Sequence, residues 1–301
     1  MELHVPEGAL LGLVGESGCG KSTLVRAVMG VLPPGASMSG RVLVAGAPAR
    51  RDRLWRDLAF VPQTAMNAFD PVYRLRDQMR EVLCGRGLLG RAEADRRAAD
   101  LFRDVGLDPA RLHDFPHQFS GGMRQRAGIA LALALHPKLL LLDEPVTALD
   151  VIVQRQVLDT LRDLAAARRL SAVIVTHDIS VVAYLCDEVA VMYAGRIVER
   201  GPARDVLTRP AHPYTMGLMN AFPDLLGADA ELTSIDGAPP DLLYPPPGCR
   251  FAPRCPFALP ACTQADPVML ATGPGHDAAC IRAPEAAALR TRALQPNVWA
   301  A

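Results

Sequence analysis

The stretch that most constrains this chain is an octapeptide near its N-terminus. Residues 15–22 read Gly-Glu-Ser-Gly-Cys-Gly-Lys-Ser and match G-x-x-x-x-G-K-[ST], the phosphate-binding loop of nucleotide hydrolases. A short apolar run, residues 9–14, precedes the loop, and residues 22–29 have the apolar spacing of a helix. Because a strand, a glycine-rich turn and a helix N-terminus together form a cradle for phosphate, we predict a nucleoside triphosphate site here.

Neighbouring residues of this phosphate loop have different expected roles. The loop amides would surround the phosphates, Lys21 would reach the β- and γ-phosphates, and the Ser22 hydroxyl would hold Mg²⁺. The candidate nucleotide-binding residues are Gly15, Ser17, Gly18, Cys19, Gly20, Lys21, Ser22 and Thr23. The alternative is a glycine-rich turn with an incidental lysine, which leaves the flanking strand and helix pattern unexplained.

Two adjacent acids follow the most hydrophobic run of the chain. Residues 139–142 are four leucines, and Asp143 and Glu144 come directly after them. An apolar run this short predicts a central strand of a parallel sheet that is covered on both faces. At the end of that strand Asp143 can hold Mg²⁺, directly or through water, and Glu144 can orient and deprotonate an attacking water. Helix capping by the two acids is the alternative.

Strands alternating with helices predict an α/β core. Further strands are predicted at residues 41–45, 58–61, 172–176, 188–193 and 196–199, and helices at 75–107 (in two segments), 124–135 and 151–167. The helices between about residues 67 and 135 interrupt the alternation. After about residue 202 periodicity fades and proline, glycine and cysteine increase. We therefore expect an appended module that is held by something other than a large core.

Composition and charge narrow the class of protein. Lys and Arg total 32, and so do Asp and Glu, so bulk electrostatics give no reason to expect a nucleic-acid partner. No apolar run reaches the roughly 18 residues of a membrane span. The N-terminus lacks the pattern of a signal peptide. These features predict a soluble cytoplasmic protein.

Five motifs occur in an order that resembles the ATP-binding subunit of ABC transporters. They are the phosphate loop, Gln63 after a strand, the Ser120-Gly121-Gly122-Met123 turn with Gln125, Asp143-Glu144, and Thr176-His177-Asp178. The resemblance covers roughly residues 1–200. It implies an α/β P-loop NTPase (RecA-like) core with an inserted helical subdomain. Phe119 and Met123 stand where the family often has Leu and Gln.

This resemblance implies a role for each motif. Gln63 would sense the metal and the attacking water, Glu144 would be the general base, and His177 would contact the γ-phosphate. The Mg²⁺ set would be Ser22, Gln63 and Asp143. Taken singly, Gln63 could be an ordinary surface residue and His177 a core histidine at a strand end.

The Ser120 turn, which we call the signature turn (Ser120–Met123), would face the nucleotide of a second ATPase subunit. A Ser-Gly-Gly turn at a helix N-terminus is a second anion site, and one chain cannot easily present both helix ends to one γ-phosphate. The sequence therefore favours a head-to-tail pair, in which Asp150 of a D-loop would help join the halves. A simple N-cap is the alternative for Ser120.

The C-terminal part is similar to the extension of oligopeptide/dipeptide import ATPases, with some nickel importers as close relatives. The similarity rests on residues 212–215, 235–240 and 247–256, and residues 66–72 also fit this subfamily. It implies ATP hydrolysis coupled to peptide import at the cytoplasmic face of the cell membrane. The implied partners are two permease subunits, a second ATPase (paralogue or self) and, indirectly, a peptide-binding protein. The alternatives are a nickel or other small-solute importer, a soluble ABC ATPase, and a non-catalytic structural or redox partner.

The expected domains are an ATP-binding core (1–66 and 136–205), a helical signature subdomain (67–135) and a C-terminal extension (206–301). Members of the family usually begin about 30 residues earlier, with strands carrying an aromatic that stacks on adenine. We expect the true start of this protein to lie upstream of Met1. The alternative is a form that binds ATP weakly and leaves a sheet edge unpaired.

Four cysteines cluster in the C-terminal extension: Cys249, Cys255, Cys262 and Cys280. Their wide spacing lacks the C-x₂-C pairs typical of zinc fingers. It suits a [4Fe–4S] cluster held by four thiolates, and similar tails in the peptide-importer family are associated with one. Zn²⁺ and free or disulfide-bonded thiols are the alternatives, and His276 could replace one ligand.

Overall fold

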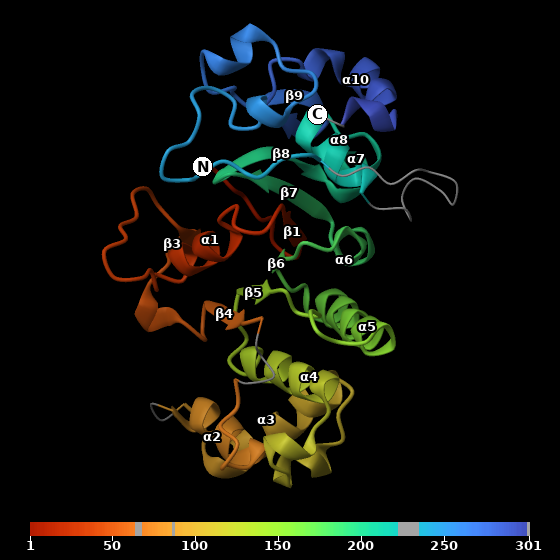
Figure 1. The fold of residues 1–301 in the computed structure, drawn as a ribbon. Helices are drawn as coiled ribbons and strands as arrows, with labels where there is room; N and C mark the ends of the chain where they lie inside the picture. The colour runs from red at the N-terminus through yellow and green to blue at the C-terminus, as the bar shows by residue number, and fades with distance from the viewer. Residues whose placement is uncertain (64–67, 86–87, 222–234, 300–301) are drawn as a thin grey trace. The chain divides into compact units, whose positions relative to one another are not determined.

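The structure is a computed structural model that describes residues 1–63, 68–85, 88–221 and 235–299 (Figure 1). The chain divides into two compact units. The first comprises Met1–His4, Leu11–Lys21 and Thr176–Ala301, and the second comprises Val5–Leu10 and Ser22–Val175. The domain boundaries expected from the sequence stay predictions.

Three parallel strands form the sheet of the second unit: β4 (Leu58–Val61), β5 (Leu139–Asp143) and β6 (Ala172–Val175). The leucine run lies on β5, which pairs with β4 on one side and β6 on the other. Leu140, Leu141 and Leu142 are buried, as a strand covered on both faces requires. The prediction of a central parallel strand is confirmed, and it brings Asp143 to the end of that strand.

Five helices and a short hairpin are further elements of the second unit among the described residues. The helices are α1 (Lys21–Val28, whose first residue belongs to the first unit), α2 (Leu75–Cys84), α3 (Arg91–Asp104), α4 (Gly121–Ala132) and α5 (Val151–Arg168). α2 buries Leu75, Met79 and Leu83, which recur every four residues on one helix face. Figure 1 shows α2, α3 and α4 grouped together. The strand predicted at 41–45 is instead a short hairpin, β2 (Leu43–Val44) and β3 (Ala47–Pro48).

In the first unit, β1 (Leu10–Val14) pairs in parallel with β7 (Glu188–Tyr193), and β7 forms an antiparallel hairpin with β8 (Arg196–Pro202). All five residues of β1 are buried. The hairpin turns at Ala194 and Gly195, both of which have positive φ. The predicted strand before the phosphate loop and the closing hairpin are therefore both confirmed.

The C-terminal extension continues the β8 edge with two more strands, β10 (His276–Ala278) and β9 (Leu270–Gly273). Its helices are α7 (Ala203–Thr208), α8 (Pro213–Asn220) and α10 (Ala286–Ala293), and α6 (Ile179–Leu185) precedes the hairpin. The expectation of a module without a large core is wrong. A buried cluster includes the aromatic side chains Tyr193, Tyr214, Phe251, Phe257 and Trp299. These residues are too widely spaced in sequence to produce a periodic signal.

A buried carboxylate ties the extension to β8. Glu199, 0% exposed, accepts hydrogen bonds from the amides of Ala211 (2.6 Å) and His212 (2.9 Å), and it lies 2.7 Å from Nε2 of His276. Three partners satisfy a charge that would otherwise be costly to bury. Because His276 is engaged here, the expectation that it could serve as a metal ligand is not met. None of the helices in the described part of the chain has the length and apolar character needed to span a membrane.

Candidate nucleotide site

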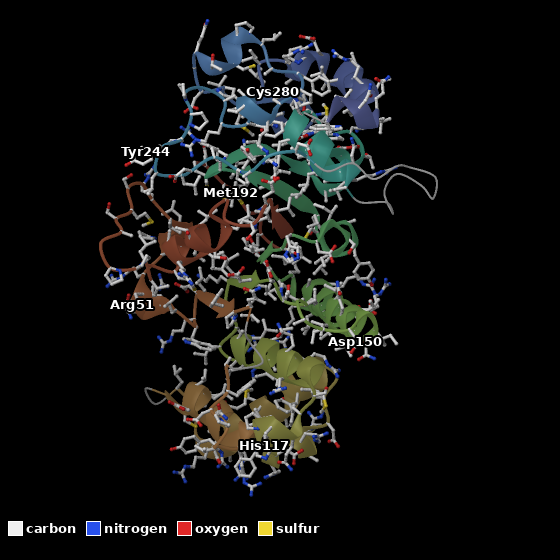
Figure 2. All side chains as sticks on the ribbon, in the orientation of Figure 1. Arg51, His117, Asp150, Met192, Tyr244 and Cys280 are labelled. Atoms are coloured by element: carbon white, nitrogen blue, oxygen red, sulfur yellow. The ribbon has the colours of Figure 1, made fainter. Side chains whose placement is uncertain are left out.

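The phosphate loop follows β1 and requires glycine where its backbone turns. A Cβ on Gly15 would lie 2.1 Å from the carbonyl oxygen of Met192. Met192, labelled in Figure 2, belongs to β7. Gly20 has φ +106°, a conformation that side-chain-bearing residues rarely adopt. The backbone amide of Gly195, in the β7–β8 turn, donates to the carbonyl of Cys19 in the phosphate loop at 2.8 Å. The neighbouring strand and turn thus hold the loop in shape.

The side chain of Lys21 folds back on the phosphate loop. Its side chain is 7% exposed, and Nζ donates to the carbonyl oxygens of Gly15 (2.7 Å) and Glu16 (3.0 Å). The loop residues that would meet phosphate on the outer side are exposed, namely Ser17, Gly18, Ser22 and Thr23. Cys19 is buried, and burial raises the pKa of its thiol although Lys21 acts in the opposite direction. The thiol therefore fills space in the loop.

In the second unit, Glu144 follows β5 in a strained backbone conformation. Its φ of +49° is unusual for a residue with a side chain, and its amide donates to the Val175 carbonyl at 2.8 Å. Two side chains converge on its Oε2: Nε2 of Gln63 at 2.6 Å and Oγ1 of Thr147 at 3.0 Å. The structure thus brings the predicted general base and the predicted sensor residue into direct contact. Thr147 was not singled out from the sequence.

The three residues expected to hold Mg²⁺ line the same cavity in the second unit. Ser22, Gln63 and Asp143 are among the residues that line it, and its volume is about 1300 Å³. They offer hydroxyl, amide and carboxylate oxygens, and Mg²⁺ in nucleotide sites takes a few protein oxygens together with phosphate and water. The donor set fits this ion.

The signature turn contains the N-cap of α4, Ser120, and the first three residues of that helix. The Ser120 hydroxyl accepts a hydrogen bond from the amide of Met123 at 3.3 Å. Ser120 is exposed, whereas Gln125 is 3% exposed and its Nε2 has no partner among the described residues. A Cβ on Gly122 would lie 2.1 Å from Cγ1 of Val153, so any side chain here would force Val153 or the start of α4 to shift. Gly121 and Met123 are half-buried.

The expected D-loop ends at the start of α5. Figure 2 shows Asp150 at the beginning of that helix, where its Oδ1 accepts from the amide of Val153 at 2.9 Å. The next two side chains, Val151 and Ile152, are 81% and 73% exposed. His177, in the first unit, is exposed, and it lies two residues after the end of β6 in the sequence and directly before Asp178, the N-cap of α6. Met66 and Asn67, part of the segment after Gln63, lie outside the described residues.

Sequence reasoning missed the contacts of Glu16, an interior residue of the phosphate loop. Its carboxylate is paired with Arg254 through two hydrogen bonds, Nη1 to Oε2 at 2.9 Å and Nη2 to Oε1 at 3.1 Å. Its amide donates to the Tyr214 hydroxyl at 2.9 Å. Both partners belong to the C-terminal extension. The sequence carried no signal for either contact, because local patterns do not reveal which distant residue an arginine meets.

The four cysteines of the extension do not form a metal site in this structure. No group of three or more His, Cys, Asp or Glu within the described ranges is placed to hold a metal ion. Burial, above all, raises the pKa of Cys255 to about 12, and charges on Cys280, Cys249 and Cys262 act in the same direction. Burial thus favours the neutral form of the Cys249, Cys255 and Cys280 thiols, and the structure does not support a [4Fe–4S] or zinc site.

Comparison with known families identifies the class of the protein. The profile of the ABC transporter family matches residues 1–147, and that of the oligopeptide/dipeptide transporter C-terminal region matches residues 198–262. A part of the ABC transporter complex cbiONQ, the cbiO1 structure from Clostridium perfringens, superposes with a TM-score of 0.62 at 26% identity and covers 68% of this chain and 82% of that one. The fold and site define an ABC-type ATPase with a C-terminal extension.

Full-length relatives narrow the family further. A probable peptide ABC transporter ATP-binding protein, y4tR of Sinorhizobium fredii, is 43% identical over 95% of this chain and 89% of its own length. The oligopeptide transport protein OppD of Salmonella typhimurium is 43% identical over 91% and 84%, and the dipeptide transport protein DppD of Bacillus subtilis is 41% identical over 91% and 85%. The chain belongs to the ATP-binding subunits of oligopeptide/dipeptide ABC transporters.

Proposed function

We propose that this subunit hydrolyses ATP at a composite site to drive peptide import. One half of the site is its own phosphate loop with Lys21, and the other half is the signature turn of a companion ATPase. The observation that carries the proposal is the contact between Gln63 and Glu144 at 2.6 Å, beside a cavity that Ser22 and Asp143 also line. The contact supports the proposal because it joins an amide and a carboxylate at the ends of two paired strands, β4 and β5.

Glu144 would act as the general base toward the attacking water. The hydrogen bonds from Gln63 and Thr147 fix the orientation of its carboxylate, and a general base must be held within hydrogen-bond reach of the proton that it takes. When bound, Mg²⁺ would neutralise charge that develops on the phosphates. His177 is proposed to contact the γ-phosphate, which its exposure after β6 permits.

The proposal requires a second ATPase subunit in head-to-tail orientation. The exposed serine of the signature turn supports it, because a helix N-terminus attracts an anion. Exposed Val151 and Ile152 beside Asp150 offer apolar surface of the kind that a partner covers. A related solved structure, the MJ0796 bacterial ABC transporter cassette, is dimeric and 25% identical with a TM-score of 0.57.

Coupling to transport would run through two permease subunits, with this subunit peripheral to the membrane. The relatives named above are peptide transport proteins, which favours peptides over nickel or another small solute as the cargo. The test is ATP hydrolysis by the complete transporter in liposomes, with and without a loaded peptide-binding protein. We expect peptide to stimulate hydrolysis and to accumulate inside. Hydrolysis that ignores peptide but responds to nickel would overturn the assigned cargo.

A metal on the four cysteines stays a separate proposal. Its support is the spacing of Cys249, Cys255, Cys262 and Cys280 in the sequence, which suits four thiolate ligands. Anaerobically purified protein should contain about four iron and four sulfide ions per chain if they hold a [4Fe–4S] cluster. A variant with all four cysteines changed to serine is the control, and equal iron content in both proteins would reject the cluster.

A further inference from the structure

Glu16 is engaged at each of its polar groups. Its carbonyl accepts from Lys21 Nζ at 3.0 Å, its amide donates to the Tyr214 hydroxyl at 2.9 Å, and its carboxylate takes both outer nitrogens of Arg254. One residue therefore connects the phosphate-binding lysine to two residues of the C-terminal extension. All four residues lie in the first unit.

Arg254 is also held in place by contacts other than the one with Glu16. Its Nε donates to the carbonyl of Asp236 at 2.9 Å, and its Nη1 also reaches the Tyr193 hydroxyl at 3.2 Å. Its side chain is only 9% exposed. A planar guanidinium fixed in this way offers a rigid fork for a carboxylate, which a lysine ammonium cannot provide.

The ion pair is not needed to attach the extension to the core. The rings of Tyr193, Tyr214 and Phe251 already pack against one another, with centroids 4.6 to 5.4 Å apart. Glu199 also joins β8 to α8 and β10. Buried ion pairs contribute little net stability compared with such packing, and their best-attested use is to specify geometry. The geometry specified here is that of the phosphate loop.

We propose that Arg254 and Tyr214 are positioning residues for ATP, through which the C-terminal extension holds the phosphate loop in its binding shape. Arg254 neutralises a carboxylate that would otherwise repel the triphosphate, and Tyr214 fixes the backbone whose carbonyl receives Lys21. Burial raises the pKa of the Tyr214 hydroxyl, so it stays a neutral acceptor. This extends the proposed role of residues 15–22, on which it rests, by giving the peptide-transporter extension a part in nucleotide binding.

The test measures Kd for Mg·ATP on the purified full-length subunit, and KM and kcat on the assembled transporter. Arg254→Gln should raise Kd and KM about tenfold and leave kcat within about twofold, because a buried charge pair is broken away from the reacting atoms. Arg254→Lys should recover only part of the loss. Arg282→Gln is the matched control, since Arg282 also belongs to the extension and pairs with a glutamate, Glu285, away from the loop.

Two further variants make the result specific. Adding Glu16→Gln to Arg254→Gln should restore part of the affinity, because the unpaired carboxylate is removed. Tyr214→Phe deletes one oxygen and keeps the ring, so it should raise Kd about threefold without unfolding the protein, and it decides the matter if Arg254→Gln folds poorly. Lys21→Ala is the reference, and it should abolish binding.

The outcomes distinguish a failure of the proposed phosphate loop from a failure of the role proposed for the C-terminal extension. If Lys21→Ala binds Mg·ATP normally, the proposed phosphate loop itself fails. If Lys21→Ala loses binding while Arg254→Gln and Tyr214→Phe keep wild-type Kd, only the role of the extension is overturned. An equal loss in Arg282→Gln, or strictly additive losses for Glu16 and Arg254, would likewise overturn it, because the effect would then not pass through their contact.

Discussion

Two helix N-termini in this chain are predicted to meet phosphate, and they are built differently. α1 begins behind a loop that buries Lys21 and holds Glu16 by an ion pair, whereas α4 begins at an exposed serine with a neutral hydroxyl. The first is positioned by charge, and the second by close packing of Gly122 on Val153. From this difference we expect the first site to bind a triphosphate alone, and the second to add to a nucleotide that is already bound to a companion subunit.

The largest expected effect is on ATP hydrolysis, and it comes from replacing Glu144, the proposed general base. Glu144→Gln should lower steady-state ATP hydrolysis by about 10²–10⁴-fold, since the amide cannot accept the proton of the attacking water. ATP binding should persist, and ATP should hold two subunits together. Single-turnover assays and light scattering measure the two effects. Turnover close to that of the unaltered protein would remove Glu144 from the role of base.

A negative charge introduced at the signature turn tests the role of that turn independently of the phosphate loop. Aspartate caps helices as well as serine does, so Ser120→Asp should keep α4 intact. Its negative charge would oppose a γ-phosphate, and hydrolysis by the assembled transporter should fall about 100-fold. ATP affinity of the isolated subunit should not change, and Ser120→Thr is the control. Lost affinity in the isolated Ser120→Asp subunit would mean that the turn serves the nucleotide of its own chain.

Close packing at the signature turn predicts a loss of stability. Gly122→Ala would place a methyl 2.1 Å from Val153 Cγ1, and the free energy of unfolding should fall by about 3 kcal/mol through overpacking. Adding Val153→Ala should return part of this loss. Urea denaturation of the single and double variants measures both. Equal unfolding midpoints for Gly122→Ala and the unaltered protein would show that α4 is not held by this contact.

A third helix N-terminus, that of α8, serves as a structural contrast. Its cap is His212, whose Nδ1 accepts from the amide of Tyr214 at 3.1 Å, and burial lowers the His212 pKa to about 3. In the unfolded chain the pKa is about 6.5. Between these values the unfolded state binds a proton that the folded state excludes, so stability is present above pH 6.5 and is lost as the pH falls toward 3.

The loss attributable to His212 between pH 7 and pH 5 should be about 2 kcal/mol. His212→Asn keeps an acceptor for the helix cap and cannot be protonated in this range, so its stability should depend less on pH by that amount. Urea midpoints of both proteins at the two pH values give the difference. Parallel pH profiles would show that His212 is protonated in the folded protein.

The contrast between the two phosphate-facing helices also shows what a sequence can predict. The strand before the phosphate loop, α1, β5 and α4 were all expected, because each is encoded by a contiguous run with its own turn or cap. The pairing of Glu16 with Arg254 joins residues 238 positions apart, and no local pattern reports it. The core of the extension was missed for the same reason, since Tyr214, Phe251 and Trp299 meet only after folding.

The side-chain contact of Gln63 with Glu144 lies between these cases. Both residues were predicted from their motifs, and the parallel pairing of β4 with β5 brings the ends of their strands together. Thr147 was not predicted, because its contact depends on the unusual backbone conformation at Glu144. Periodicity predicts elements, whereas the angle at which a chain leaves a strand does not follow from it.

Photocleavage with trapped vanadate tests the composite site most directly. Vanadate takes the place of the γ-phosphate in the assembled transporter, and light cuts the backbone beside it. The account predicts cuts in this chain both within residues 15–22 and at Ser120. Cuts confined to the phosphate loop would contradict it, because the companion's nucleotide would then never meet this subunit's signature turn.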